Sequence, residues 1–508
     1  MELNAVKQAI TTNELLLEQT IEQAIDTDFT LPDYCPDIER VLKCRVTPRL
    51  SSKSVSGDSL NIDGTALITL IYTDGSGVIS SHEHEAKFQK IITLGDISLS
   101  DSTVSVTLCN DYMNCRAVTS RKMDIHGVIC IKVKVEGTNR REILCDIDCD
   151  GIQLKSDSCP ATNPLGKAEK TVVVEEELEL SRGNTNIASV LRHEVRPIID
   201  ECKMVGNKAV VTGDLIICAL YCSTDSEVCK YENRVPFNQI LELDVNGVEC
   251  KCDARMTLMS STLKPRVNLT GECNSFSFDC KLSLVVTASC DNEVSVLYDA
   301  FCTKSALDIE KDNITLKKLE TNINERYMCK KTLEFSENSF GSVVDLWCEQ
   351  NIGQVKIVGG KLNLNGTITV CIISIDTSGQ PQYFERGIDF EYGHELDLDK
   401  TNLKADVDVS SVSSAYTIIG DDKLEARIEL TINGGIYSVA TKNVLINANI
   451  KPDEKPTPKK APIVVYFAES GEDVWDISKR YNSSCSDIIE INELDGDIIN
   501  SDKMLIVP

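Results

Sequence analysis

The sequence predicts a mainly β protein, with three tandem antiparallel β-sandwich-like domains and then a small α/β domain ordered strand, helix, helix, strand. A polar residue, a glycine and an apolar β-branched run recur three times, and a phenylalanine follows each glycine after 24 residues. Helical periodicity is weak over the first 450 residues. The glycines are Gly64, Gly213 and Gly366, and the phenylalanines are Phe88, Phe237 and Phe390. We expect the glycines at equivalent strand starts and the rings buried in equivalent places.

The flanks of the repeated strand set the expected domain boundaries. Segment 156–170 has the proline and glycine content of a linker, and segment 304–315 shows no sustained period. Four prolines in residues 451–462 predict an extended spacer. The predicted units are repeats at 1–155, 171–303 and 316–450, the Pro/Lys-rich linker at 451–462, and the last domain at 463–508.

Charge and hydropathy exclude several classes of protein. The 508 residues carry a formal charge of −27, which opposes binding to nucleic acid or anionic lipid. No apolar run reaches the roughly 18–20 residues of a membrane span. The first residues lack the basic start and apolar core of a secretory signal, so we expect a cytosolic protein.

Cysteine is abundant, and we expect the thiols to be reduced and mostly buried. The chain has 22 cysteines, many inside strand runs, and no Cys-x-x-Cys pair. Three short segments have some of the spacing of a metal site, and packing or turn chemistry explains each better. They are Cys250-Lys251-Cys252, His82-Glu83-His84 and the calcium-loop-like Asp397 to Thr401. We expect neither a metal nor a cofactor.

No arrangement of residues points to catalysis. The chain has no Gly-x-Ser-x-Gly elbow, no His-Glu-x-x-His and no phosphate loop. Its carboxylates are spread along the chain, so no acid–base pair stands out. We therefore expect a protein that is not an enzyme.

The last domain resembles the LysM module. The matching residues are Val465, Tyr466, Gly471, Glu472, Asp473, Val474, Trp475, Ile477, Ile488, Ile491, Asn492, Leu494, Leu505 and Pro508. The resemblance implies a groove for N-acetylglucosamine polymers between two loops. Here Asp473 replaces a threonine of the family pattern, and Ser501-Asp502-Lys503 replaces Pro-Gly-Gln. These departures disfavour sugar binding.

From this resemblance we assign candidate roles within the module. The expected partner-binding groove consists of Glu472, Asp473, Val474, Ile498, Ser501 and Asp502. The expected structural residues are Gly471, Trp475 and Asn492. We expect Trp475 to anchor the core of the module, and Asp473, Ser501 and Asp502 to be exposed.

The first repeat resembles the repeated domain of clostridial spore-envelope proteins, through Thr27 to Ile38 and the Gly64 strand. Three such domains before one LysM module is the architecture of the SipL-like, SpoIVA-interacting family. The resemblance implies a scaffold of spore-coat assembly in the mother-cell cytoplasm, at the forespore surface. It also implies that the module binds a SpoIVA-like morphogenetic ATPase, alongside contacts with other spore-envelope proteins. Two alternatives remain: a peptidoglycan-binding protein of the cell wall or spore cortex and, more weakly, a cell-wall hydrolase.

Overall fold

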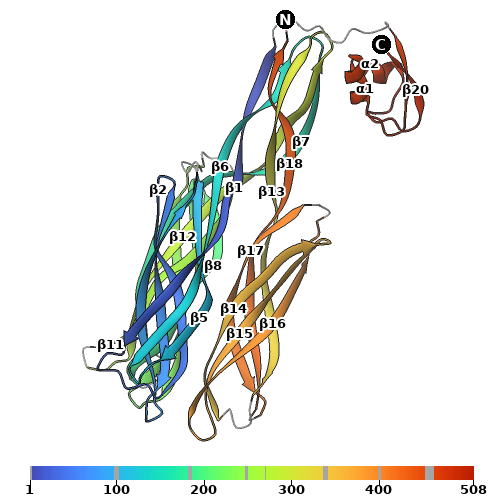
Figure 1. The fold of residues 1–508 in the computed structure, drawn as a ribbon. Helices are drawn as coiled ribbons and strands as arrows, with labels where there is room; N and C mark the ends of the chain where they lie inside the picture. Colours follow the sequence, from blue (N-terminus) through green and yellow to red (C-terminus); the bar gives the residue numbers. More distant parts are fainter. Residues whose placement is uncertain are drawn as a thin grey trace.

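The computed structural model describes residues 3–95, 102–180, 186–245, 250–268, 271–335, 341–398, 402–420, 422–451 and 463–508 (Figure 1). More than three quarters of these residues are in strands, and the two helices found among them belong to the C-terminal domain. The mainly β fold class predicted from the sequence is confirmed.

Within the described residues, each repeat contributes six strands. The first repeat holds β1 (Asn4–Thr30), β2 (Arg40–Ser56), β3 (Ser59–Thr73), β4 (Ile79–Thr93), β5 (Ser102–Ala117) and β6 (Lys122–Asp148). The second holds β7 (Ile152–Glu179), β8 (Ile187–Val205), β9 (Lys208–Ser223), β10 (Val228–Glu242), β11 (Lys251–Arg266) and β12 (Ser275–Cys302). The third holds β13 (Leu307–Glu334), β14 (Ser342–Val358), β15 (Lys361–Ile375), β16 (Pro381–Glu395), β17 (Leu403–Ile418) and β18 (Lys423–Ile450).

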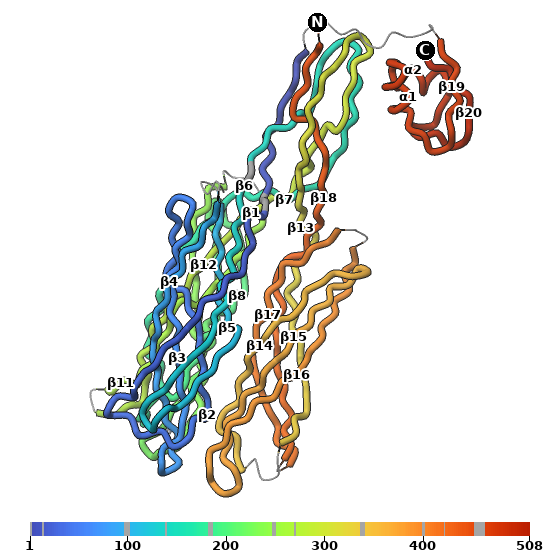
Figure 2. Tube along the Cα trace, viewed as in Figure 1, coloured from blue at the N-terminus to red at the C-terminus, as the bar shows by residue number. Residues whose placement is uncertain are grey.

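All three repeats share one topology. The first, sixth and fifth strands form one three-stranded antiparallel sheet, and the second, third and fourth form the other. The apolar faces of the two sheets pack on each other, so each repeat has its own core. Each repeat is thus a small sandwich, with two merged on one side of Figure 2 and the third beside them.

The repeated glycine and phenylalanine are direct partners across two strands. Gly64 pairs with Phe88, Gly213 with Phe237, and Gly366 with Phe390. A Cβ atom added to Gly64 would lie 2.1 Å from Cζ of Phe88, so the ring lies directly on the glycine backbone. All three rings are buried. The fixed spacing of 24 residues is therefore the length of one hairpin, measured from a glycine to the ring that covers it.

The long first and sixth strands extend beyond the sandwiches and join in a common stem (Figure 1). One apolar cluster of the stem contains Ile10 and Ile143 from the first repeat, Val294 from the second and Leu316 from the third. A second cluster, nearer the tip, again draws side chains from all three repeats. Because side chains from all three repeats build both clusters, the stem depends on all three repeats.

The sandwiches also meet one another in a shared apolar cluster. Ile71, Leu220 and Ile373 lie in it, each seven residues after its repeat glycine. The strand that carries Ile71 is buried on alternate residues up to Ala66 and on every residue from there to its end. Its second face is covered by the neighbouring repeats, which explains the uninterrupted apolar run in the sequence.

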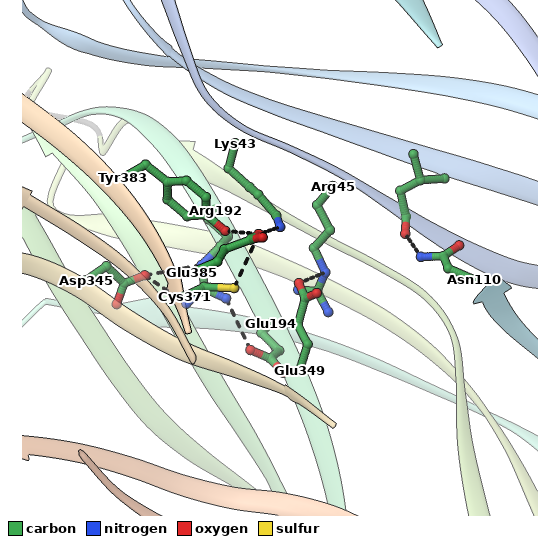
Figure 3. A network of polar contacts seen from close by, with 11 residues as sticks. Lys43, Arg45, Asn110, Arg192, Glu194, Asp345, Glu349, Cys371, Tyr383 and Glu385 are labelled. Atoms are coloured by element: carbon green, nitrogen blue, oxygen red, sulfur yellow. Dashed lines mark hydrogen bonds and ion pairs between the residues drawn. The ribbon is translucent and has the colours of Figure 1, made fainter. Parts of the chain in front are cut away.

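Beside this cluster, a polar network links the repeats (Figure 3). Lys43, Arg192 and Asp345 occupy equivalent positions, each pairing with the residue seven after its repeat glycine. The buried Arg192 donates to the buried Asp345 of the third repeat, with Nη2 and Oδ2 separated by 2.9 Å. Lys43 pairs with Glu385 of the third repeat. Equivalent positions therefore carry a positive charge in the first and second repeats and a negative charge in the third. Opposite charges at these positions favour packing of the third repeat against the other two.

Two expected boundaries differ from the structure. Segment 156–170 is not a linker, because it lies within β7 and pairs with β12 along its length. Segment 304–315 likewise runs into β13, which begins at Leu307. Both segments supply stem strands, and prolines are tolerated in β7 because it is an edge strand of its sheet. The predicted linker at 451–462 lies, apart from residue 451, outside the described residues.

The C-terminal domain has the predicted order of elements. It contains β19 (Val464–Ala468), α1 (Val474–Tyr481), α2 (Cys485–Ile491) and β20 (Lys503–Val507). Its core gathers Val474, Ile477, Ile488, Leu505 and Val507 between the helices and one face of the sheet. Asn492 joins α2 to β20, because its amide bonds the carbonyl oxygen of Ile488 and both backbone polar groups of Ile506.

Candidate functional site

The candidate site is the pair of loops that would form the groove of the C-terminal domain. Residues 469–473 precede α1, and residues 492–502 follow α2. Backbone hydrogen bonds join these loops: Gly471 N to Ile499 O at 2.7 Å, Ile499 N to Glu472 O at 2.9 Å, and Val474 N to Asp497 O at 2.8 Å. Gly471 has φ of +93°, which favours glycine at this turn. The two loops therefore form one connected surface.

Two of the acidic groove residues brace this surface. Glu472 accepts hydrogen bonds from the Tyr466 hydroxyl at 2.8 Å and from the backbone of Glu469 at 3.0 Å. The exposed Asp502 accepts from the backbone N–H of Ser470 at 2.9 Å. Ser501 and Ile498 are exposed, and 51% of Ile498 is accessible to solvent. The surface available to a partner is therefore formed by Ile498, Ser501 and the outer edges of the acidic side chains.

Two groove assignments need correction. Val474 is only 1% exposed and belongs to the core, so its side chain supports the groove from below and is not part of its surface. Asp473 is half-buried, not fully exposed. Its carboxylate caps α1 by accepting from Trp475 N at 2.8 Å, and it forms an ion pair with Lys155 of β7. Sequence reasoning missed the second role because Lys155 lies 318 residues away.

Trp475 is the anchor between two domains, which corrects its expected role in the module core. The side chain is only 7% exposed, but its indole lies against the tip of the stem. The ring packs edge to face on Phe301 of β12, with centroids 5.0 Å apart. The indole N–H donates to Asp299 at 2.8 Å. The core of the module is filled by smaller aliphatic residues.

Further contacts extend this docking along both helices. Lys479 of α1 bonds both carboxylate oxygens of Asp299, at 2.8 and 2.7 Å. Asn482 donates to the carbonyl oxygen of Thr303 at 2.8 Å. At the start of α2, Cys485 N donates to the side chain of Gln153 at 3.2 Å. We call this set, together with Trp475 on Phe301 and Lys155 with Asp473, the docking contact.

Asp299 is the electrostatic centre of the docking contact. Its burial opposes ionisation, but the hydrogen bonds from Lys479 and Trp475 outweigh that effect and hold the pKa of Asp299 below 3.8. Burial also opposes the charge of Lys155, and the bond to Asp473 outweighs it, so the pKa of Lys155 rises above 10.5. Both groups are therefore charged near neutral pH, the condition in which their contacts are strongest.

The outer face of the two-stranded sheet is apolar and exposed. Val465 pairs with Ile506 and Phe467 with Met504, and all four side chains point away from the core. Phe467 is 75% exposed. The domain around this face carries ten acidic and three basic residues. An apolar patch with a charged surround is typical of a protein-binding surface. The signal in the sequence is that both strands are apolar at successive positions, so that apolar side chains face outward as well as toward the core.

A second candidate lies between the first two repeats. A cavity of about 230 Å³ is lined by residues that include Arg45, Arg49, Glu83 and His193, with Trp347 of the third repeat at its border. Burial lowers the pKa of His193 to about 4, so this imidazole is neutral. Arg45 pairs with Glu349 at 3.2 Å. Four basic and two acidic side chains line the cavity, which belongs to the junction between repeats.

Among the described residues, no group of three or more His, Cys, Asp and Glu side chains is placed to hold a metal ion. His82 and His84 lie on β4 with their rings against Phe29. The calcium-like segment at Asp397 lies partly outside the described residues. No helix in the described parts of the chain is long and apolar enough to cross a membrane.

Comparison with known families agrees with these domains. Residues 37–118 and 186–264 match the family described as SipL, SPOCS domain, and residues 469–508 match the LysM domain. The SPOCS matches span β2 to β5 in the first repeat and β8 to β11 in the second. The combination confirms the resemblance seen in the sequence, and both families are non-catalytic binding domains. No curated protein and no solved structure matches the chain.

Proposed function

We propose that this protein is a non-enzymatic scaffold of endospore envelope assembly whose LysM domain docks a SpoIVA-like morphogenetic ATPase. Sporulation-related SPOCS segments and a LysM domain in one chain support this proposal. The three repeats hold one another in a single stem, and the LysM domain lies at the stem tip. The proposed site of action is the mother-cell face of the forespore.

The observation that carries the proposal is the exposed apolar face of the LysM sheet. A glycan presents hydroxyl groups, whereas a patch that includes Phe467 and Met504 gains most by burial against another protein. The net charge of the domain, three basic against ten acidic residues, favours a partner whose apolar patch has a basic rim. We assign the groove residues Glu472, Asp473, Ile498, Ser501 and Asp502 to the border of this contact.

The alternative function is binding of peptidoglycan or another N-acetylglucosamine polymer. The LysM match favours it, because the family is of the peptidoglycan-binding type. Three interactions disfavour this alternative. Glu472 and Asp502 already accept hydrogen bonds within the domain, and Asp473 forms an ion pair with Lys155 of the stem. A glycan entering beside Asp473 would have to displace that ion pair.

A capture experiment from sporulating cells separates the two functions. The full chain and a chain lacking residues 463–508 are used as bait, and bound proteins and glycans are identified. We expect the full chain alone to retain the ATPase. Retention by the shortened chain, or retention of glycan without the ATPase, would contradict the proposal.

A further inference from the structure

Two cysteine thiols meet across the open edge of the second sandwich. Cys202 lies on β8, an edge strand of the sheet β10-β9-β8, and Cys252 lies on β11, an edge strand of the sheet β11-β12-β7. Their sulfur atoms are 3.0 Å apart. A disulfide bond has a sulfur–sulfur length of about 2.05 Å, so closure requires a movement of roughly 1 Å.

The two thiols differ in reactivity. The Cys202 thiol donates a hydrogen bond to the Cys252 sulfur, and this bond lowers the pKa of Cys252 and raises that of Cys202. Since the thiolate is the reactive form, Cys252 is the better nucleophile and Cys202 the resolving thiol. Both side chains are half-exposed, so a small oxidant can reach them.

We propose that Cys202 and Cys252 are a site of covalent crosslinking, closed by hydrogen peroxide or another hydroperoxide. The Cys252 thiolate attacks one peroxide oxygen, the O–O bond breaks, and a sulfenic acid and a hydroxide form. The Cys202 sulfur then attacks the Cys252 sulfur, the S–O bond breaks, and the departing hydroxide leaves as water with the Cys202 proton. Two thiols are oxidised to one disulfide. Hydrogen peroxide is reduced to two waters, because the hydroxide of the first step takes up the proton lost by Cys252; an organic hydroperoxide gives one alcohol and one water.

The bond would join β8 and β11, two edge strands that belong to different sheets of this repeat. It links residues 50 positions apart and restricts the unfolded chain accordingly. In the first repeat, Cys44 and Cys115 lie on the corresponding strands β2 and β5, and their interaction raises the pKa of Cys44 and lowers that of Cys115. The corresponding strand of the third repeat, β17, has no cysteine. Oxidation of Cys202 and Cys252 would thus stiffen the second repeat relative to the third.

Peptide mapping after peroxide treatment tests the proposal. The reduced full chain is exposed to a small excess of hydrogen peroxide at neutral pH, blocked with a thiol reagent, digested and analysed by mass spectrometry. We expect a peptide joined through Cys202 and Cys252 that is two hydrogen atoms lighter than its parts. We also expect the thermal midpoint of the oxidised protein to rise and to return on reduction.

Three variants separate this bond from other thiol chemistry. Cys252→Ser should abolish the crosslinked peptide, and Cys202→Ser should leave a trappable sulfenic acid at Cys252. Cys250→Ser is the matched control, since this nearby thiol should not be needed. Failure of the native chain to form the bond, or pairing of Cys252 with Cys250 or Cys290, would overturn the proposal.

Discussion

At the scale of single residues, Trp475 determines where the LysM domain lies. The position of Trp475 in the sequence matches a family motif, and that motif predicts that the side chain is buried. The motif does not predict the residues that Trp475 contacts, because Phe301 and Asp299 lie more than 170 residues earlier in the chain. A buried tryptophan with its N–H on a carboxylate is typical of an interface that is apolar on one side and polar on the other.

Trp475→Ala should therefore release the LysM domain from the stem and leave the domain folded. The lost ring contact and hydrogen bond correspond to roughly 2–4 kcal/mol of docking free energy. Hydrogen exchange of the full chain is the measurement: we expect faster exchange near Phe301 and Thr303, with protection inside α1 and α2 retained. Trp347→Phe, at the junction of the repeats, is the control. Loss of protection throughout residues 463–508 would instead show that Trp475 holds the module core.

The docking contact should also depend on pH. Asp299 has a lowered pKa when docked, so its contribution is fully present above the ordinary value of 3.8 and is lost as pH falls through the lowered value. Lys155 has a raised pKa, so its contribution is lost only as pH rises past 10.5. We expect the domain to be docked near neutral pH and to separate in acid below about pH 4. Small-angle scattering at a series of pH values measures the separation of the domain from the stem. In the Asp299→Asn variant, the part of this acid transition that is due to protonation of Asp299 should be absent.

At the scale of strands, the sequence predicted the repeat well because one hairpin carries its signature. The glycine and the phenylalanine are cross-strand partners, so their spacing is fixed by hairpin length in every copy. The stem strands were predicted poorly. Residues 156–170 contain Pro160, Pro164 and Gly166, a composition typical of linkers, yet they pair along β12. Their strand structure depends on the neighbouring repeats, which local composition cannot reveal.

Phe237→Ala should destabilise the second repeat by roughly 3–5 kcal/mol, because it removes a buried ring and leaves a cavity. Gly213→Ala should also destabilise it, since the added Cβ would lie 2.0 Å from the carbonyl oxygen of Ile198. Gly387→Ala is the matched control, because its Cβ would make an ordinary 3.5 Å contact with Thr367. Denaturant unfolding of the full chain measures all three. Equal stability of the Gly213 and Gly387 variants would contradict the close packing of the Ile198 backbone and the Phe237 ring on Gly213.

At the scale of the whole molecule, three similar sandwiches form one body because each supplies different side chains at equivalent positions. Lys43, Arg192 and Asp345 illustrate this, and the pairing of Arg192 with Asp345 was invisible in the sequence. The candidate site shows the same limit. Motif matching located the two groove loops, but it did not show that Val474 is buried, that Lys155 occupies Asp473, or that the far face of the sheet is apolar.

In the proposed function, the LysM domain binds a protein through its exposed apolar face. The most direct measurement is calorimetric titration of the full chain, and of its Phe467→Asp variant, with a purified SpoIVA-like ATPase and with N-acetylglucosamine oligomers. Phe467 is 75% exposed, so the substitution should leave the melting temperature unchanged, and Ile91→Asp, at a residue 70% exposed on the first repeat, is the control. We expect Phe467→Asp to weaken ATPase binding at least tenfold while Ile91→Asp does not. Tight binding of the oligomers, with ATPase binding unaltered by Phe467→Asp, would contradict a protein-binding role for this face.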